Sequence, residues 1–522
     1  MEGAVAVEPK ISRTRRFLHG VWLGYTNQAL MMLGGIWLTP FLLHRIGQHD
    51  YGLWLVGTQL LMYLTLLDIG VVALVPRETA YATGKAGSAE QATDLPLMVG
   101  QIVRVVLYQM PLVLLAVGVA WWALPREWYG FRGAIGLTLI AFVLTFPLRI
   151  FQALLQGLQD FHFLGHTQIV TWIVSTAVLV VLVLKGSGFY ALAAGWIITQ
   201  VLSAGFAIYR VKRRFPTILP RRLPKLPWSA LSSYLSRGFW ISLSQIEALL
   251  LGGADILIIG KLNGAAAVVP YTCTKKLVSV LSNQPNVAMQ AASPGLSELK
   301  SAGSRPRMFQ AITALTQGLL LLSGLVACVV LAVNHSFVSW WVGPAQYSGL
   351  LMTGLMVLDM MLRHWRTTAV YSIFCFGYER RISIGTLLDS CLSAGASLLF
   401  VWKLGPIGAP MGSILGVCLI GLPVNLEALT REVGVSFLGL LSPLWPWFWR
   451  MAIISAAALA VGWRFTSMQF LGLATTSSLI GLIYLAVMFG PGQPNSALAS
   501  YVRPRLDVLW KRLSWARPVA EP

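Results

Sequence analysis

Apolar residues occur along this chain in long continuous runs, which charged residues interrupt only rarely. A run of about 20 apolar residues is the length that a helix needs to cross a bilayer, and we count fourteen. The runs lack the short alternating pattern of an outer-membrane barrel. The pattern therefore predicts an all-α polytopic membrane protein. The approximate spans are 17–43, 52–76, 97–123, 133–158, 167–184, 188–209, 238–260, 265–292, 308–333, 347–374, 382–402, 407–428, 444–463 and 469–489.

A basic, proline-rich segment divides these spans into groups. KRRFPTILPRRLPKLP, residues 212–227, contains four prolines, which exclude a regular helix. FLLHRIG at 41–47 and IIGKLNG at 258–264 end the first span of each half in a similar way. We therefore expect two six-helix lobes and a C-terminal helix pair. The predicted divisions are an N-terminal lobe at 1–211, a cytoplasmic linker at 212–236, a second lobe at 237–432, and a final pair with a basic tail at 433–522.

Composition and charge agree with this interpretation. The chain is 56% hydrophobic and 11% charged, with a formal net charge of +20. If both termini are cytoplasmic, most lysines and arginines fall in cytoplasmic loops, as the positive-inside rule requires. The charge then faces anionic lipid, and the sequence offers no soluble basic module for nucleic acid. The first span is too long for a signal peptide, so we expect it to be retained.

One predicted span carries a polar stripe. Arg149, Gln152, Gln156 and Gln159 follow one another at helical spacing within LTFPLRIFQALLQGLQ. A cation deep in a span costs about 2.5–3.5 kcal/mol on insertion scales, so the stripe should face water or protein. The glutamines either hydrogen-bond neighbouring helices or line a cavity, and we favour the cavity.

The second half has a matching stripe that begins at Lys276 and includes Asn283 near a proline. We expect it to face the Arg149 stripe across a wet, net-positive chamber. Two acids, Glu247 and Asp255, lie in the preceding span. They are candidates for binding a coupling ion, H+ or Na+, and Asp255 or Glu247 could equally be the partner of Lys276.

Another span holds Asp359, Arg363 and Arg366 at helical spacing. The two arginines are candidates for binding substrate, although Asp359 is placed to neutralise Arg363. Asp68, at the end of a span, is more typical of a structural polar residue.

No catalytic or metal-binding pattern is present in the sequence. His162 and His166 have the spacing of a zinc helix but lack the glutamate between them, and no Walker A motif occurs. The five cysteines fall in or beside apolar spans without a CxxC pair. We expect a protein that is not an enzyme and has neither a catalytic residue, a metal site nor an organic cofactor.

Two stretches resemble a known family. PFLLHRIGQHDYGLWLVGTQLLMYLTLLDIGVVALVPRETA, residues 40–80, is similar to the N-terminal signature of the bacterial oligosaccharide-lipid flippases. DILIIGKLNGAAAVVPYTCTKKL, residues 255–277, resembles its second-half counterpart. The resemblance implies membership of the multidrug, oligosaccharidyl-lipid and polysaccharide exporter (MOP) superfamily, whose two six-helix lobes give alternating access to a central cavity.

The resemblance also implies a function. The O-antigen and capsule branch moves undecaprenyl-pyrophosphate-linked glycans from the inner to the outer leaflet of the bacterial cytoplasmic membrane, for lipopolysaccharide or exopolysaccharide synthesis. Its partners would be the lipid-linked oligosaccharide, membrane lipids, a polysaccharide polymerase and a chain-length regulator. A lipid II flippase, a drug or cation antiporter, and a membrane glycan polymerase or ligase are the alternatives.

Overall fold

The structure is a computed structural model that describes residues 13–86, 94–282, 305–374, 376, 378–464, 469–489 and 497–498. The described residues are almost entirely helical, which confirms the predicted fold class. They form two compact units, residues 1–246 and 247–522. The predicted division into six, six and two helices stays a prediction.

The first unit consists of nine α-helices among the described residues, the last of which continues into the second unit. Short 3-10 turns separate some of them, including η1 at Thr65–Asp68 and η3 at Phe146–Leu148. The α-helices are α1 Arg13–Ile46, α2 Gln48–Leu64, α3 Val71–Ala86, α4 Leu95–Trp122, α5 Arg132–Thr145, α6 Arg149–Gly157, α7 Phe161–Leu184, α8 Phe189–Arg214 and α9 Trp228–Asn263.

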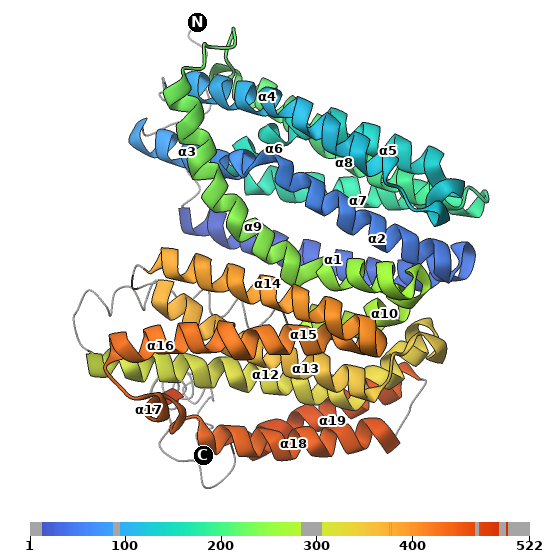
Figure 1. The fold of residues 1–522 in the computed structure, drawn as a ribbon, viewed down its shortest axis with the longest axis vertical. Coiled ribbons are helices and arrows are strands. Elements are labelled where there is room, and N and C mark those ends of the chain that lie inside the picture. The colour runs from blue at the N-terminus through green and yellow to red at the C-terminus, as the bar shows by residue number, and fades with distance from the viewer. Residues whose placement is uncertain are drawn as a thin grey trace, which may run out of the picture. The chain divides into compact units, whose positions relative to one another are not determined.

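The second unit contains the end of α9 and the remaining helices. Its long helix α12 is largely buried, and α18 and α19 pack along it (Figure 1). The Tyr484 hydroxyl of α19 donates a hydrogen bond of 2.8 Å to the Leu321 carbonyl of α12. The final pair is thus part of this unit. Its helices are α10 Ala265–Leu281, α12 Arg305–Val342, α13 Leu350–Phe374, α14 Glu379–Leu404, α15 Gly408–Gly416, α16 Leu422–Val433, α17 Phe437–Leu441, α18 Trp445–Arg464 and α19 Phe470–Phe489.

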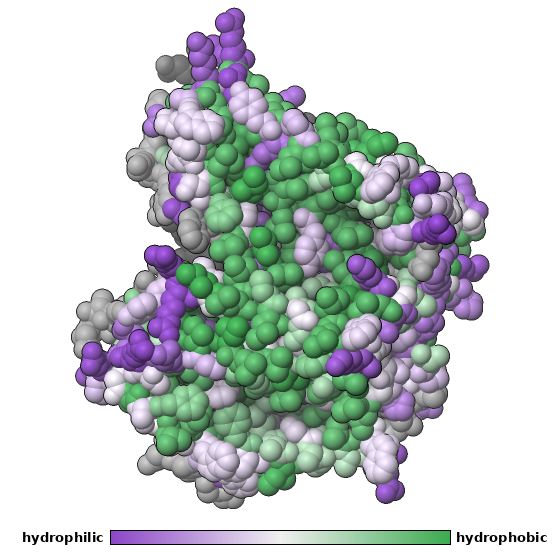
Figure 2. Space-filling model, viewed as in Figure 1, coloured by the Kyte–Doolittle hydropathy of each residue, from purple (hydrophilic) through white to green (hydrophobic). Residues whose placement is uncertain are grey.

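The helices are apolar enough to cross a membrane. Among the described residues, seven satisfy the length and composition of a span, or up to nine if two bent pairs each count as one. Each of the fourteen predicted runs overlaps a helix, but the number fourteen itself stays a prediction. Figure 2 shows apolar side chains along the helices and hydrophilic ones toward their ends. This distribution fits helices that lie across hydrocarbon.

The two similar sequence segments adopt the same backbone conformation. Gly47 joins α1 to α2 with φ 93° and ψ 159°, and Gly264 joins α9 to α10 with φ 85° and ψ 158°. Residues that have a Cβ rarely adopt this positive-φ conformation. Each glycine therefore permits an abrupt change of helix direction. The similarity between residues 41–47 and 258–264 in sequence therefore extends to the backbone conformation of their final glycines.

A second kind of break occurs inside the first unit. The helical segments 48–68 and 71–79 meet at 63°. Ile69 and Gly70 both have positive φ, at 47° and 67°. A Cβ at Gly70 would lie 2.2 Å from the carbonyl oxygen of Gly238, so the break packs directly on α9. Discontinuous helices of this kind expose backbone carbonyls inside a membrane protein.

We predict that Gly70→Ala destabilises the protein. The left-handed backbone costs about 1–2 kcal/mol for a residue with a Cβ, and the overlap with the Gly238 carbonyl adds to that cost. The thermal unfolding midpoint of the purified protein in detergent should fall by several degrees. Gly205→Ala in α8 is the control, because nothing lies within 4 Å of its Cβ. Equal midpoints for the two variants would contradict the packing described here.

Candidate substrate and ion sites

Arg149 lies at the break of the α2–α3 helix. Pro147, in the turn η3, separates α5 from α6, so α6 starts afresh at Arg149. The guanidinium Nη1 donates to the Thr65 carbonyl at 3.3 Å and lies 3.4 Å from the Asp68 carboxylate. Arg149 therefore forms a hydrogen bond with a backbone carbonyl and an ion pair with a carboxylate at the break.

Asp68 is the structural centre of this break. Its side chain is 1% exposed, and its Oδ1 accepts a hydrogen bond of 2.8 Å from the Gly70 amide. Gln109 of α4 donates to the Asp68 carbonyl at 2.9 Å. These contacts fix the chain where it turns, which agrees with the structural interpretation of Asp68. They also make Asp68 the ionic partner of Arg149, a pairing that the sequence analysis did not predict.

Three residues of the predicted stripe lie on one face of α6, whereas Gln159 lies beyond the end of the helix with φ 58°. Gln152 and Gln156 are exposed, whereas Ile150 and Leu154 on the other side are buried in the core of the first unit. The Arg149 side chain is 34% exposed, between these extremes. Helical spacing thus placed these three polar residues correctly on one accessible face. That this face binds substrate stays a prediction.

The second stripe is only partly described. Asn283 lies outside the described residues. Lys276 is half-buried on α10, and the Ser279 hydroxyl donates to its carbonyl. The neighbouring Lys275 is the residue that binds Asp255, at 2.5 Å, and the Tyr271 hydroxyl donates to the same carboxylate. The partner of Asp255 is therefore Lys275 and not Lys276.

A network of ion pairs joins α13 to its neighbours. Arg363 contacts Asp359 at 3.1 Å, one helical turn away, as the sequence indicated. Both Arg363 and Arg366 also contact Asp389 of α14, at 3.5 and 3.3 Å. Glu247, the other coupling candidate, lies 3.5 Å from Arg366.

Asp389 is a functional candidate that sequence reasoning missed. Its side chain is fully buried, at 0% exposed, between two arginines. The signal was a lone carboxylate within the apolar run at 382–402. The Arg366 side chain is 9% exposed, so in this structure it contacts the acids of the network and does not lie on an open surface.

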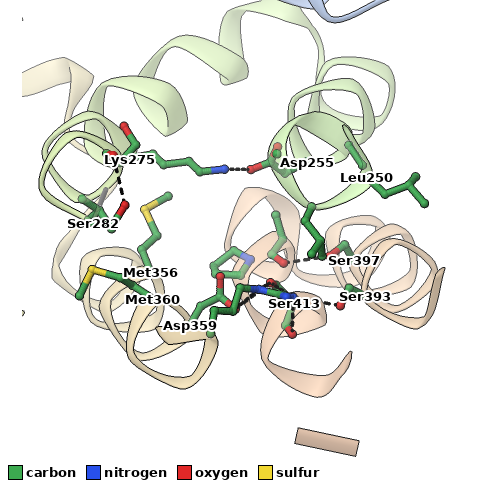
Figure 3. Close-up of a pocket in the computed structure, with 18 of the residues that line it drawn as sticks. Leu250, Asp255, Lys275, Ser282, Met356, Asp359, Met360, Ser393, Ser397 and Ser413 are labelled. Carbon is green, nitrogen blue, oxygen red and sulfur yellow. Dashed lines mark hydrogen bonds and ion pairs between the residues drawn. The ribbon is translucent and has the colours of Figure 1, made fainter. Parts of the chain in front are cut away.

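A cavity of about 370 Å³ lies within the second unit (Figure 3). Helices α9, α10, α13, α14 and α15 each contribute to its wall, and Lys275 and Asp255 point toward each other across it. Asp359 and Arg363 lie on the α13 wall, where Ser413 of α15 hydrogen-bonds both. Of the predicted candidates, the cavity wall includes Asp255 and Arg363; Lys276, Arg366 and Glu247 are outside it.

The charges of the cavity wall compensate one another. Among its described residues, two carboxylates (Asp255 and Asp359) face two cations (Lys275 and Arg363) at ion-pair distance. The acids Asp389 and Glu247 and the cation Arg366 form a further layer behind them. This part of the molecule therefore lacks the positive excess that the sequence analysis expected.

No metal centre is evident within the described ranges, where no group of three histidine, cysteine, aspartate or glutamate residues could hold an ion. The rings of His162 and His166 are tilted by 37° with centroids 4.3 Å apart, and the His166 ring contacts the His162 carbonyl.

The fold is that of known membrane transporters. The solved structure of the lipid II flippase MurJ, in its inward closed conformation, superimposes with a TM-score of 0.62 at 11% identity. That match covers 90% of this chain and 99% of the other. An inward-facing multidrug resistance MATE family transporter of the MOP superfamily gives a TM-score of 0.51 at 13% identity, covering 78% and 97%. This chain has the MOP superfamily fold.

A comparison with family models matches part of the chain. Residues 129–346 match a family described as "Polysaccharide biosynthesis protein". A search of curated proteins finds no match for this sequence. The fold that the resemblance of residues 40–80 and 255–277 implies is thus confirmed.

We predict that the burial of an acid, and not the number of its arginine partners, determines how much stability the protein loses when that acid is neutralised. Asp389→Asn leaves Arg363 and Arg366 without their shared buried acid, which typically costs about 3–5 kcal/mol. The thermal midpoint in detergent should fall markedly.

Glu427→Gln is a matched control, because Glu427 also contacts two arginines, Arg381 and Arg431, but is 52% exposed. Exposed pairs contribute about 0–1 kcal/mol, so this variant should unfold close to the wild type. A larger loss in Glu427→Gln than in Asp389→Asn would refute the assignment.

Proposed function

We propose that this protein is a flippase that moves undecaprenyl-pyrophosphate-linked oligosaccharide from the inner to the outer leaflet of the cytoplasmic membrane by alternating access. The observation that carries the proposal is Arg149, an accessible arginine within an apolar span, followed by Gln152 and Gln156 on the same face of α6. The fold shared with a lipid II flippase and the polysaccharide biosynthesis family match support it.

The geometry of Arg149 suits a diphosphate. A phosphate cannot cross hydrocarbon unless protein groups replace its water. Among the described residues, the hydrogen bond to Thr65 and the ion pair with Asp68 both use Nη1. The edge formed by Nε and Nη2 can then bind two phosphate oxygens at once. The glutamine amides that follow can bind sugar hydroxyls.

The ion pair with Asp68 lowers the energetic cost of placing Arg149 in a membrane span. An unpaired guanidinium in a span is costly, whereas the pair with Asp68 is neutral while the site is empty. At 3.4 Å the two groups form an ion pair without a direct hydrogen bond, so an arriving phosphate can compete for the guanidinium. This arrangement keeps the arginine charged and in place between transport cycles.

Two observations favour other members of the superfamily. The extensive structural match to the lipid II flippase favours lipid II as an alternative cargo. The acid-rich network of Asp255, Asp359 and Asp389 favours a cation-coupled antiporter more than the sequence analysis allowed. A polymerase or ligase would alter the covalent structure of lipid-linked oligosaccharide, and a flippase would not. A polysaccharide polymerase and a chain-length regulator are the proposed partners.

We predict that Arg149 is required for flipping. Arg149→Ala should abolish translocation of undecaprenyl-pyrophosphate-linked oligosaccharide in proteoliposomes while membrane insertion is retained. Because this change removes the ionic partner of the buried Asp68, the double variant Asp68→Asn/Arg149→Gln tests function in a neutral, folded background. It should also fail to flip. Wild-type flipping by a correctly folded double variant would refute the proposal.

We further propose that H+ or Na+ drives the cycle by binding at Asp255 or Glu247. An ion at Asp255 would compete with Lys275, and one at Glu247 with Arg366, so binding would release a cation in the second unit. Net accumulation of substrate in the outer leaflet should then require an imposed pH or Na+ gradient. Accumulation that is unchanged without either gradient would eliminate ion coupling.

A further inference from the structure

The cavity in the second unit has the chemistry of a sugar site. Besides the two compensated ion pairs, six serine and threonine hydroxyls line its wall: Ser279, Ser282, Thr367, Ser393, Ser397 and Ser413. Its volume of about 370 Å³ falls within the range of small-molecule sites, which are about 300–1,000 Å³. Apolar surface is also present, from Met356 and Met360 on α13 (Figure 3).

Three of these hydroxyls retain the capacity to accept hydrogen bonds, whereas Ser393 and Ser413 already accept from Arg363. Ser279, Ser282 and Thr367 each donate to a carbonyl three or four residues earlier in their own helices. A hydroxyl has one proton and two lone pairs, so each oxygen can still accept from a ligand. Ser279 is exposed to the cavity, and Thr367 is half-buried on the α13 wall.

Donors are present as well. Lys275 has three N–H groups and contacts Asp255 at 2.5 Å. The Nη1 of Arg363 is buried and lies 3.5 Å from the Asp389 carboxylate, so Lys275 is the donor that the wall offers to a ligand. A ligand that both donates and accepts would satisfy these groups, as the hydroxyl groups of a sugar do.

The charge balance argues against a phosphate in this cavity. Each cation of the wall already contacts a carboxylate, and the fully buried Asp389 adds negative charge behind Arg363. An anion would have to displace those acids, whereas a neutral polyhydroxyl group would not. In the first unit, Arg149 also contacts an acid, Asp68, but among the described residues its polar contacts use Nη1 alone, and its side chain is 34% exposed.

We propose that this cavity is the subsite for the glycan of the lipid-linked substrate, and that it binds sugar hydroxyls independently of the diphosphate. The inference rests on the proposed function and deepens it, since it names a site in the second unit for the glycan part of the substrate. Ser279 and Thr367 are its specificity-determining residues on facing helices.

A pair of glycines allows a sharp test. Gly252 of α9 lines the cavity, and nothing lies within 4 Å of the Cβ that a substitution would add. Gly395 of α14 has the same open surroundings but is not part of the wall. Gly252→Leu therefore fills the cavity, and Gly395→Leu is the matched control.

The experiment measures the affinity of the full-length purified protein for two lipids, undecaprenyl-pyrophosphate-linked oligosaccharide and undecaprenyl pyrophosphate without sugar. Gly252→Leu should weaken binding of the first by at least about tenfold and change the second by less than about twofold. Thr367→Val, which removes one hydroxyl at constant shape, should weaken binding of the first by about threefold to tenfold. Gly395→Leu should alter neither affinity.

Two results would overturn the inference alone: equal weakening of both lipids by Gly252→Leu, or no effect on either. A wild-type protein that binds neither lipid would overturn the proposed function, and the inference with it. Binding of both lipids by the wild type with the same affinity would retain the proposed function and reject a glycan subsite.

Discussion

Every charge inside an apolar span must find a partner or water, and this requirement organises both units. Arg149 finds Asp68 and the Thr65 carbonyl, Lys275 finds Asp255, and Arg363 shares Asp389 with Arg366. Because these pairs join different helices, they fix the packing as well as the charge. Removing one partner of a buried pair costs more stability than the whole pair contributes, because the other charge is left buried and unpaired.

The same requirement separates two kinds of polar surface. In the first unit, a broken helix exposes a carbonyl, and it binds an arginine whose side chain is 34% exposed. In the second unit, acids and bases balance around a cavity rich in hydroxyls. A substrate with a charged diphosphate and a hydroxyl-rich glycan offers a matching group to each surface.

The sequence predicted what depends on local periodicity. Apolar run length located the helices, and helical spacing placed Arg149, Gln152 and Gln156 on one face and paired Asp359 with Arg363. It could not choose Lys275 over Lys276 as the partner of Asp255, because both lie within reach along α10 and the choice depends on how α9 packs beside it. Asp389 was missed for the same reason, since its arginines lie on another helix.

The most direct test of this account is an experimental structure of the full-length protein with undecaprenyl-pyrophosphate-linked oligosaccharide bound. We expect the diphosphate within hydrogen-bond distance of the Arg149 guanidinium. A diphosphate bound elsewhere, with Arg149 still closed on Asp68, would contradict it.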